Sequence, residues 1–252
     1  MNEVTLVRTF PRVAAACAGL GMMICGAVRA DFAGYEIPLI PYESVPNFLK
    51  YSPDMNLGEV LAVAVNSSGR IMVLNHPGSA SNGGPLYGNA TSQLLEFDEH
   101  GNFLREVGQN VYGLGYSHSI RYDRHDNLWL VDKGAHTAIR FDPAGYVTLN
   151  LGRRPEGFDE FEHVEQADAV AADGYFGGPA DVTWDQDDNI YIADGYINSR
   201  VAKYDKHGNW IESWGSHGSE PGQFNLLHSI AADRQGNIYV ADRSNRRIQV
   251  FD

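Results

Sequence analysis

The stretch Val182-Thr-Trp-Asp-Gln-Asp-Asp-Asn-Ile-Tyr-Ile-Ala-Asp194 aligns with Ile230-Ala-Ala-Asp-Arg-Gln-Gly-Asn-Ile-Tyr-Val-Ala-Asp242 without a gap. Each copy predicts a short strand, a tight polar turn and a second strand that ends in Ala-Asp. A third predicted strand follows each copy and ends in an aromatic residue and an aspartate, Tyr204-Asp205 and Phe251-Asp252. Self-similarity of this kind indicates a repeat architecture.

Two further copies of the unit lie earlier in the chain, at residues 63–75 and 120–132. Apolar and polar residues alternate between turns rich in Gly, Asp and Asn, and helical periodicity is nearly absent. Four strands per unit, with recurring glycine and aromatic positions, predict an all-β fold of the β-propeller type. An acidic stretch from Glu156 to Asp173 interrupts the repeats, and we expect it to form a solvated loop insertion or a lid over one face.

The units resemble those of the NHL repeat family, which are joined by a Gly-rich link like Trp214-Gly215-Ser-His-Gly-Ser-Glu-Pro-Gly222-Gln-Phe224. The resemblance covers about Leu57 to Asp252 and implies four-stranded blades of a six-bladed propeller. About four blades are present, and the fourth ends at Phe251-Asp252 before its outer strand. Because soluble proteins avoid long unpaired strand edges, we expect a chain short of its last repeats, or a ring completed by self-association with another copy.

The N-terminal thirty residues differ in composition from the repeats. Arg8 and Arg12 precede an apolar run that extends from Val13 to Val28 and is followed by Ala30. This pattern is typical of a secretory signal peptide over residues 1–30, and the alternative is an uncleaved N-terminal anchor. Residues 31–56 are rich in Pro, Tyr and Gly and predict an extended lead-in to the propeller of residues 57–252. The expected location is therefore outside the cytoplasm, periplasmic or extracellular.

Charge and cysteine content restrict the partners and the metal ligands. The formal net charge of −13 argues against a nucleic-acid backbone, and against an anionic membrane surface once the signal is removed. Both cysteines, Cys17 and Cys25, lie within the predicted signal peptide. The mature chain would then have neither disulfides nor thiolate ligands, so any metal must be held by His, carboxylate or carbonyl groups.

Histidine occurs in alternate units at one equivalent position. Two residues before the first predicted strand, the aligned units have Leu61, His118, Ala180 and His228. In a six-bladed ring, alternate blades are related by an approximate three-fold axis, so residues at an equivalent inner position converge on that axis. Three neutral imidazoles that meet there would form a zinc site with one position open to water or substrate. The alternative is that both are structural histidines held by neighbouring backbone.

Three segments resemble peptidyl-α-hydroxyglycine α-amidating lyase, a six-bladed propeller enzyme that converts a peptidyl-α-hydroxyglycine into a peptide amide and glyoxylate. They are Asp194-Gly-Tyr-Ile-Asn-Ser-Arg200, Leu227-His-Ser-Ile230 and Ala241-Asp-Arg-Ser-Asn-Arg-Arg247. The resemblance implies that zinc is held by His118, His228 and a third histidine from a later blade. It also implies a structural calcium bound partly through the backbone carbonyls of Val63 and Ile120.

The same resemblance assigns the reacting groups. It implies that Tyr196 is the catalytic base and that Arg243 binds the carboxylate of the substrate. A planar guanidinium suits that role because it can hold a carboxylate through two hydrogen bonds. The family places a further arginine where this chain has His76, which can donate a hydrogen bond but carries no permanent charge. Alternatively, Tyr196 packs as an interfacial aromatic and Arg243 pairs with a surface carboxylate.

Three functions therefore remain open from the sequence. The first is a zinc-dependent carbon–nitrogen lyase acting on a peptide or small α-hydroxyglycine-like substrate, with calcium as a structural ion and with activity impaired if one zinc ligand is absent. The second is a non-catalytic NHL propeller that binds a protein or peptide partner. The third is a strand-donating fragment that assembles with a second chain.

Overall fold

The computed structural model describes residues 5–7, 30–32, 35–37, 40–77, 92–154 and 172–252. Their regular structure consists of β-strands, which confirms the all-β prediction. The chain divides into two compact units, one formed by Met1–Phe10 with Leu49–Asp252 and the other by Pro11–Phe48. No helix within the described ranges is both long and apolar enough to cross a membrane.

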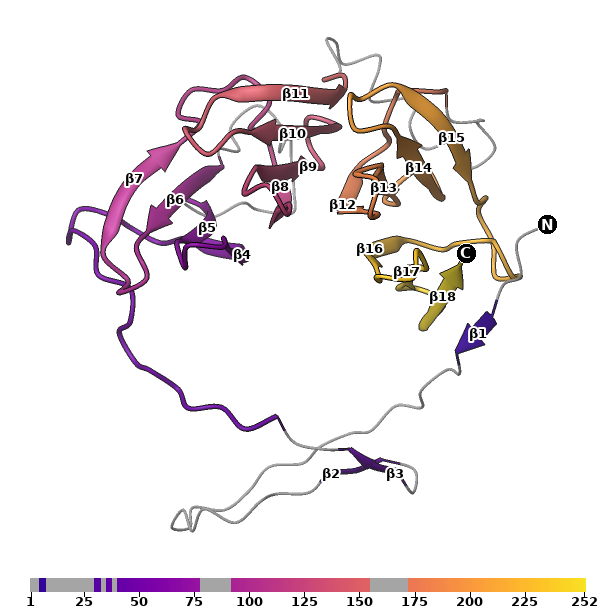
Figure 1. The fold of residues 1–252 in the computed structure, drawn as a ribbon, viewed down its shortest axis with the longest axis horizontal. Helices are drawn as coiled ribbons and strands as arrows, with labels where there is room; N and C mark the ends of the chain where they lie inside the picture. The colour runs from indigo at the N-terminus through magenta and orange to yellow at the C-terminus, as the bar shows by residue number, and fades with distance from the viewer. Residues whose placement is uncertain (1–4, 8–29, 33–34, 38–39, 78–91, 155–171) are drawn as a thin grey trace. The chain divides into compact units, whose positions relative to one another are not determined.

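The larger unit contains four antiparallel sheets of four strands each (Figure 1). The first strands of the four sheets lie innermost, and β4 contacts β8, β8 contacts β12, and β12 contacts β16. The strands are, sheet by sheet, β4 (Glu59–Val65), β5 (Ile71–His76), β6 (Gln93–Phe97) and β7 (Phe103–Val107); β8 (Ser117–Tyr122), β9 (Leu128–Asp132), β10 (Thr137–Phe141) and β11 (Val147–Gly152); β12 (Pro179–Trp184), β13 (Ile190–Asp194), β14 (Arg200–Tyr204) and β15 (Trp210–Trp214); β16 (Leu227–Ala232), β17 (Ile238–Asp242), β18 (Arg247–Phe251) and β1 (Thr5–Val7).

The fourth sheet takes its outer strand from the N-terminus of the chain. β1 pairs antiparallel with β18, with Thr5 opposite Val250 and Val7 opposite Ile248. The sequence predicted that the fourth unit ends before its outer strand, and in the structure residues 5–7 occupy that edge. These residues belong to the predicted signal peptide, so cleavage after Ala30 would separate them from the sheet. Apart from residues 5–7 and Ala30, that predicted segment lies outside the described residues.

In the described residues of the smaller unit, Pro11–Phe48, two short strands pair antiparallel. They are β2 (Ala30–Phe32) and β3 (Tyr35–Ile37), so the predicted lead-in includes a hairpin at its start. The predicted acidic insertion, Glu156 to Asp173, lies outside the described residues apart from its last two positions.

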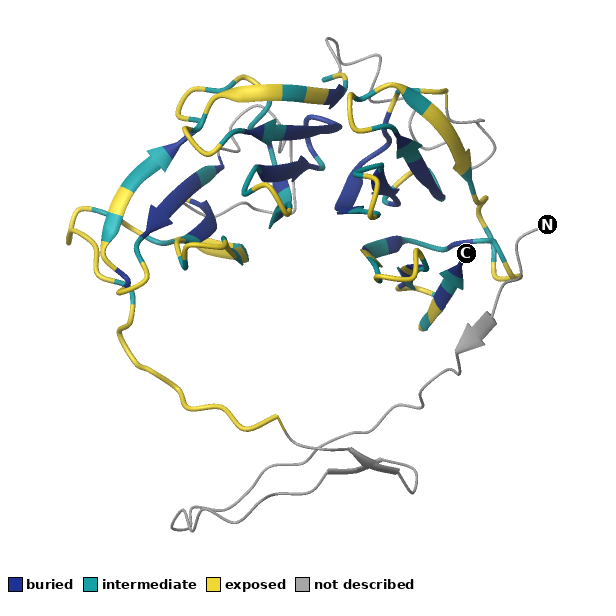
Figure 2. Ribbon diagram, in the orientation of Figure 1, coloured by how far each residue is buried: buried dark blue, intermediate teal, exposed yellow. Residues whose placement is uncertain are grey.

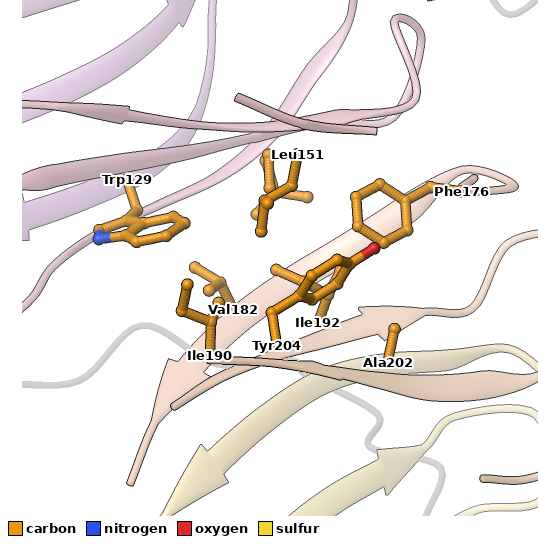
Figure 3. Close-up of a cluster of buried hydrophobic side chains, with 10 residues drawn as sticks. Trp129, Leu151, Phe176, Val182, Ile190, Ile192, Ala202 and Tyr204 are labelled. Carbon is orange, nitrogen blue, oxygen red and sulfur yellow. The ribbon is translucent and has the colours of Figure 1, made fainter. Parts of the chain in front are cut away.

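Apolar side chains fill the space between neighbouring sheets. Between the second and third sheets, Trp129 and Leu151 pack against Val182, Ile192 and Tyr204, all at most 5% exposed (Figure 3). The middle strands of these two sheets are buried over nearly their whole length (Figure 2). Burial of each large apolar side chain contributes about 1.5–3 kcal/mol, so the interface between the sheets fixes the spacing of the innermost strands.

A buried aspartate ends the second strand of each of the last three sheets. Asp132 accepts hydrogen bonds from the backbone N–H of Gly115 (2.8 Å), and Asp194 from that of Gly177 (2.7 Å). Asp242 accepts an equivalent bond from Asn225 (2.8 Å). The three carboxylates therefore cap the turns that precede β8, β12 and β16. They also hold the backbone in place where β9, β13 and β17 end.

Two neighbours of Asp194 complete that arrangement. Asn198 donates to Asp194 Oδ2 at 2.9 Å, and Arg200 Nε donates to the same atom at 3.1 Å. Asn198 and Arg200 thus tie the start of β14 to the end of β13.

Candidate functional site

Each innermost strand carries a β-bulge at the same position. The pairing register skips Leu61 in β4, His118 in β8, Ala180 in β12 and His228 in β16. A bulge places one residue outside the alternation of the strand and re-aims its side chain. The four positions that the aligned sequence singled out are therefore the four bulge residues.

The two bulge histidines meet at the hydroxyl of Tyr196. Nε2 of His118 and Nε2 of His228 each lie 3.0 Å from the Tyr196 oxygen. The two imidazole rings are 4.6 Å apart between centroids and are nearly perpendicular to each other. Because both Nε2 atoms lie 3.0 Å from the same oxygen, they are at most twice that distance apart. They converge on one point from two alternate sheets.

Hydrogen bonding determines where the protons of this cluster lie. His118 Nδ1 lies 2.8 Å from the carbonyl oxygen of Ala180, so Nδ1 carries the hydrogen and donates it. In the neutral ring, Nε2 is then an acceptor for the hydroxyl of Tyr196. The phenol oxygen in turn accepts a hydrogen bond from Nε2–H of His228. The cluster is a continuous chain of hydrogen bonds that ends on the bulge carbonyl of the third sheet.

Both imidazoles are held neutral at pH 7. Burial lowers the pKa of His118 to about 4, and the charges of His228 and Lys133 act in the same direction. Burial also lowers the pKa of His228, with a further contribution from Arg243. Burial raises the pKa of Tyr196, and the adjacent guanidinium of Arg243 opposes that rise. Tyr196 therefore rests as a phenol next to two neutral imidazoles.

Two cations flank Tyr196, and the sequence predicted only one of them. Arg243 lies beside the phenol, as expected. The ammonium of Lys133 lies 4.0 Å from the centroid of the Tyr196 ring and 5.0 Å from that of Tyr116. Lys133 follows Asp132 in the second unit as Arg243 follows Asp242 in the fourth. The repeat alignment therefore contained the signal for Lys133, at the position that His76 occupies in the first unit.

The structure does not bring His76 to the Tyr196 cluster. Its side chain is buried, with Nε2 at 3.1 Å from the carbonyl oxygen of Ser117 and the ring 4.7 Å from that of Tyr116. Nδ1 lies 3.6 Å from Oε2 of Glu59. The described contacts of His76 thus lie between the first and second sheets, and one of them, Tyr116, is also approached by Lys133.

A cavity of about 520 Å³ extends along the innermost strands beside the histidines. Its lining includes His118, His228 and Asp181, and it also includes Val63 and Ile120, the two residues predicted to bind calcium through their carbonyls. Within the described part of the chain, no three His, Cys, Asp or Glu side chains form a group suited to a metal ion. Zinc prefers nitrogen ligands in tetrahedral sites, and a hydrogen bond from the other ring nitrogen to a carbonyl is the usual support for such a ligand. His118 has this support from Ala180, and His228 can supply a second zinc ligand once its hydrogen lies on Nδ1 instead of Nε2.

Repeated four-stranded sheets that pack through their first strands define a β-propeller architecture with NHL-type blades. Residues 224–251, which include β17 and β18, match the NHL repeat family. The resemblance noted from the sequence is thereby confirmed.

Relatives named as amidating enzymes match most of the propeller. A probable peptidyl-alpha-hydroxyglycine alpha-amidating lyase of Caenorhabditis elegans is 25% identical over 224 residues, which cover 80% of this chain and 57% of the relative. Peptidyl-glycine alpha-amidating monooxygenase A of Xenopus laevis is 35% identical over 155 residues, which cover 59% of this chain and 15% of the relative. Human NHL repeat-containing protein 3 is 27% identical over 209 residues, with 79% and 54% covered. The chain thus spans between 15% and 57% of the length of these relatives.

Solved structures agree on the fold. A streptogramin B lyase superimposes with a TM-score of 0.52 at 13% sequence identity, over 80% of this chain and 53% of that protein. At this identity the likeness concerns the fold alone.

Proposed function

We propose that this chain is a lyase-type NHL propeller that cleaves the C–N bond of a peptidyl-α-hydroxyglycine to give a peptide amide and glyoxylate. The observation that carries the proposal is the convergence of His118 Nε2 and His228 Nε2 on the hydroxyl of Tyr196, at 3.0 Å each. The similarity to relatives named as amidating lyases supports it.

The proposed reaction requires little from the protein except positioning and one proton transfer. The hydroxyl of the substrate loses its proton, its oxygen forms the carbonyl of glyoxylate, and the C–N bond breaks. The electron pair of that bond goes to the amide nitrogen, which takes up the proton that the hydroxyl lost. When bound by His118 and His228, zinc would supply Lewis-acid polarisation of the substrate hydroxyl oxygen.

Tyr196 is the proposed base for the hydroxyl proton. Its phenol lies at the centre of the cluster, within hydrogen-bond reach of both imidazoles. Burial alone would keep it protonated, and the charge of Arg243 makes the phenolate more accessible. Arg243 is proposed to orient the substrate by its carboxylate, which places the reacting hydroxyl next to Tyr196.

The other proposals concern ions and location. Calcium bound through the carbonyls of Val63 and Ile120 would stabilise the innermost strands β4 and β8, which line one cavity. We also propose an exported protein whose partner is a peptide or small α-hydroxyglycine-like molecule. Self-association to extend the propeller is part of the same proposal.

A second candidate is a non-catalytic NHL propeller that binds a protein or peptide. One observation favours it: His76, aligned with a carboxylate-binding arginine of the lyases, is buried between sheets. The similarity to human NHL repeat-containing protein 3 is compatible with this candidate.

A turnover assay separates the two candidates. Purified protein supplied with zinc should release glyoxylate from an N-acyl-α-hydroxyglycine, and Tyr196→Phe should reduce kcat by at least about 100-fold, the usual scale of general base catalysis. Tyr239→Phe is the matched control, because Tyr239 is an exposed tyrosine whose hydroxyl bonds Asp233 at 3.1 Å. Elemental analysis should show zinc in the wild type and its loss in a His118→Ala, His228→Ala double variant. Wild-type protein without zinc and without glyoxylate release would support the scaffold.

A further inference from the structure

The rim above the bulge histidines presents equivalent residues from three neighbouring sheets. The backbone N–H of Lys133 bonds the carbonyl of Tyr116 at 3.1 Å, two residues before His118. The backbone N–H of Arg243 bonds the carbonyl of Leu226 at the same distance, two residues before His228. Both residues follow a buried aspartate, so they leave the same level of the propeller from the second and fourth sheets.

Tyr196 occupies the corresponding place in the third sheet. Its backbone N–H bonds the carbonyl of Gly178 at 3.1 Å, two residues before the bulge residue Ala180. Lys133 approaches the Tyr196 ring to 4.0 Å, while Arg243 lies beside the phenol. Two cations from alternate sheets thus lie next to one tyrosine.

Neighbouring cations favour a bound anion, because its charge offsets their mutual repulsion. Burial lowers the pKa of Lys133, and the charge of Arg243 lowers it further. Glu59 is the described carboxylate that opposes this effect, but its side chain is half exposed and lies nearest to His76. Within the described ranges neither Lys133 nor Arg243 forms an ion pair with a carboxylate.

We infer that Lys133 and Arg243 together bind the carboxylate of the substrate, with Lys133 as a second cation and specificity-determining residue that the sequence comparison did not assign. The inference rests on the proposed function, because it names how the same site selects a glycine-derived carboxylate. Arg243 supplies the planar, two-pronged contact, and Lys133 supplies a point charge next to the Tyr196 ring.

Titration calorimetry with unreactive ligands tests this inference without turnover. N-acetylglycine carries the carboxylate, and N-acetylglycinamide has the same shape without the charge. Lys133→Met keeps an apolar stem over the Tyr196 ring but removes the charge, so it should bind N-acetylglycine about tenfold or more weakly, as expected for loss of a contact with a charged group. Binding of the amide should be unchanged, and Lys133→Arg should retain most of the affinity for the carboxylate.

Lys203→Met is the matched control. Lys203 lies 5.2 Å from the Tyr191 ring and 3.8 Å from Glu212, so it makes a similar aromatic contact away from the cluster. Its variant should bind both ligands as the wild type does, and thermal unfolding should show that all three variants are folded. Equal affinity of Lys133→Met and wild type for N-acetylglycine, equal weakening for both ligands, or no binding of N-acetylglycine to the wild type would overturn the inference. Wild-type protein that selects the carboxylate but releases no glyoxylate from an N-acyl-α-hydroxyglycine would refute the lyase proposal and leave the carboxylate site supported.

Discussion

Asp181 connects three consecutive innermost strands, and its replacement by asparagine gives the sharpest test of how the site is held. From β12, its carboxylate accepts hydrogen bonds from Arg121 of β8, at 2.8 and 2.6 Å. It also accepts bonds from Ser229 Oγ (2.6 Å) and the backbone N–H of Ile230 (3.1 Å), both in β16. Asp181→Asn keeps the side-chain volume but removes the charge and turns an N–H₂ group toward one of these donors.

The expected loss in the free energy of unfolding follows from how deeply the ion pair is buried. Breaking a buried ion pair costs about 3–5 kcal/mol because the remaining charge is left uncompensated. The side chain of Asp181 is only 5% exposed, but that of Arg121 is 38% exposed and can recover some hydration. We therefore expect the lower end of that range, about 3 kcal/mol, measured by urea denaturation with unchanged m-value.

The pH dependence has a defined sign. Burial works to raise the pKa of Asp181, but the bonds from Arg121, Ser229 and Ile230 outweigh it and the pKa is lowered. The stabilisation is therefore fully present above the unfolded pKa of about 3.9 and is lost as the pH falls through the lower folded pKa. The stability difference between wild type and Asp181→Asn should shrink in that acidic window.

The same substitution should also loosen the histidine cluster. Asp181 is adjacent to Ala180, whose carbonyl anchors His118, and its partner Ser229 is adjacent to His228. Zinc affinity, if the site binds zinc, should fall with stability. Glu212→Ala is the control, since the pair of exposed Glu212 with Lys203 at 3.8 Å should contribute less than about 1 kcal/mol. A loss below about 1 kcal/mol for Asp181→Asn would refute the reasoning, because it would mean that Arg121 and Ile230 find equivalent partners without the carboxylate.

Three further predictions follow from individual contacts. Burial holds His118 neutral with a pKa of about 4. Its contribution to the free energy of unfolding should therefore be fully present above the unfolded pKa of about 6.5 and should be lost as the pH falls from there toward 4. His118→Gln should remove this part of the pH dependence of unfolding. Gly195→Ala should destabilise the protein and disturb the histidine cluster, because an added Cβ would lie 1.8 Å from the carbonyl oxygen of Leu227, next to His228. The unfolding midpoint and the tyrosine fluorescence should both change. Gly236→Ala is the control: the space there is open but φ is positive, so only the stability should fall. Deletion of residues 1–30 should expose the outer edge of β18 that β1 covers, so light scattering should show concentration-dependent self-association; a monodisperse deletion variant would contradict this.

The repeat pattern was sufficient to predict the strands and the alignment of the candidate residues. Alternation and turn chemistry are local properties, so the matching stretches at Val182 and Ile230 predicted β12, β13, β16 and β17. The same alignment placed His118 and His228 at one level. The β-bulges could not be predicted, because alternation alone gives no sign of an extra residue, and it is the bulge that aims these two side chains at Tyr196.

The residue that follows each strand-ending aspartate or asparagine is buried or reaches the site according to what packs against it. His76, Lys133, Gly195 and Arg243 share that position in the four units, yet they differ in environment. His76 is buried against Ser117, whereas Gly195 closely approaches Leu227 and leaves room for Tyr196 to point toward the histidines. Only the packing of neighbouring sheets distinguishes these outcomes, so an alignment to lyases identifies Arg243 and His76 but not Lys133.

The contribution of each sheet can now be separated. The second sheet supplies His118 and Lys133, the third supplies Tyr196 and the carbonyl of Ala180, and the fourth supplies His228 and Arg243. The second and fourth sheets each add one neutral imidazole and one cation, and the third adds the phenol that lies between the two imidazoles. This division explains why Asp181, which binds β8 and β16 to β12, matters to every part of the site. A substitution that removes the hydrogen bonds of Asp181 should therefore reduce metal binding and carboxylate binding together. Lys133→Met should reduce carboxylate binding alone.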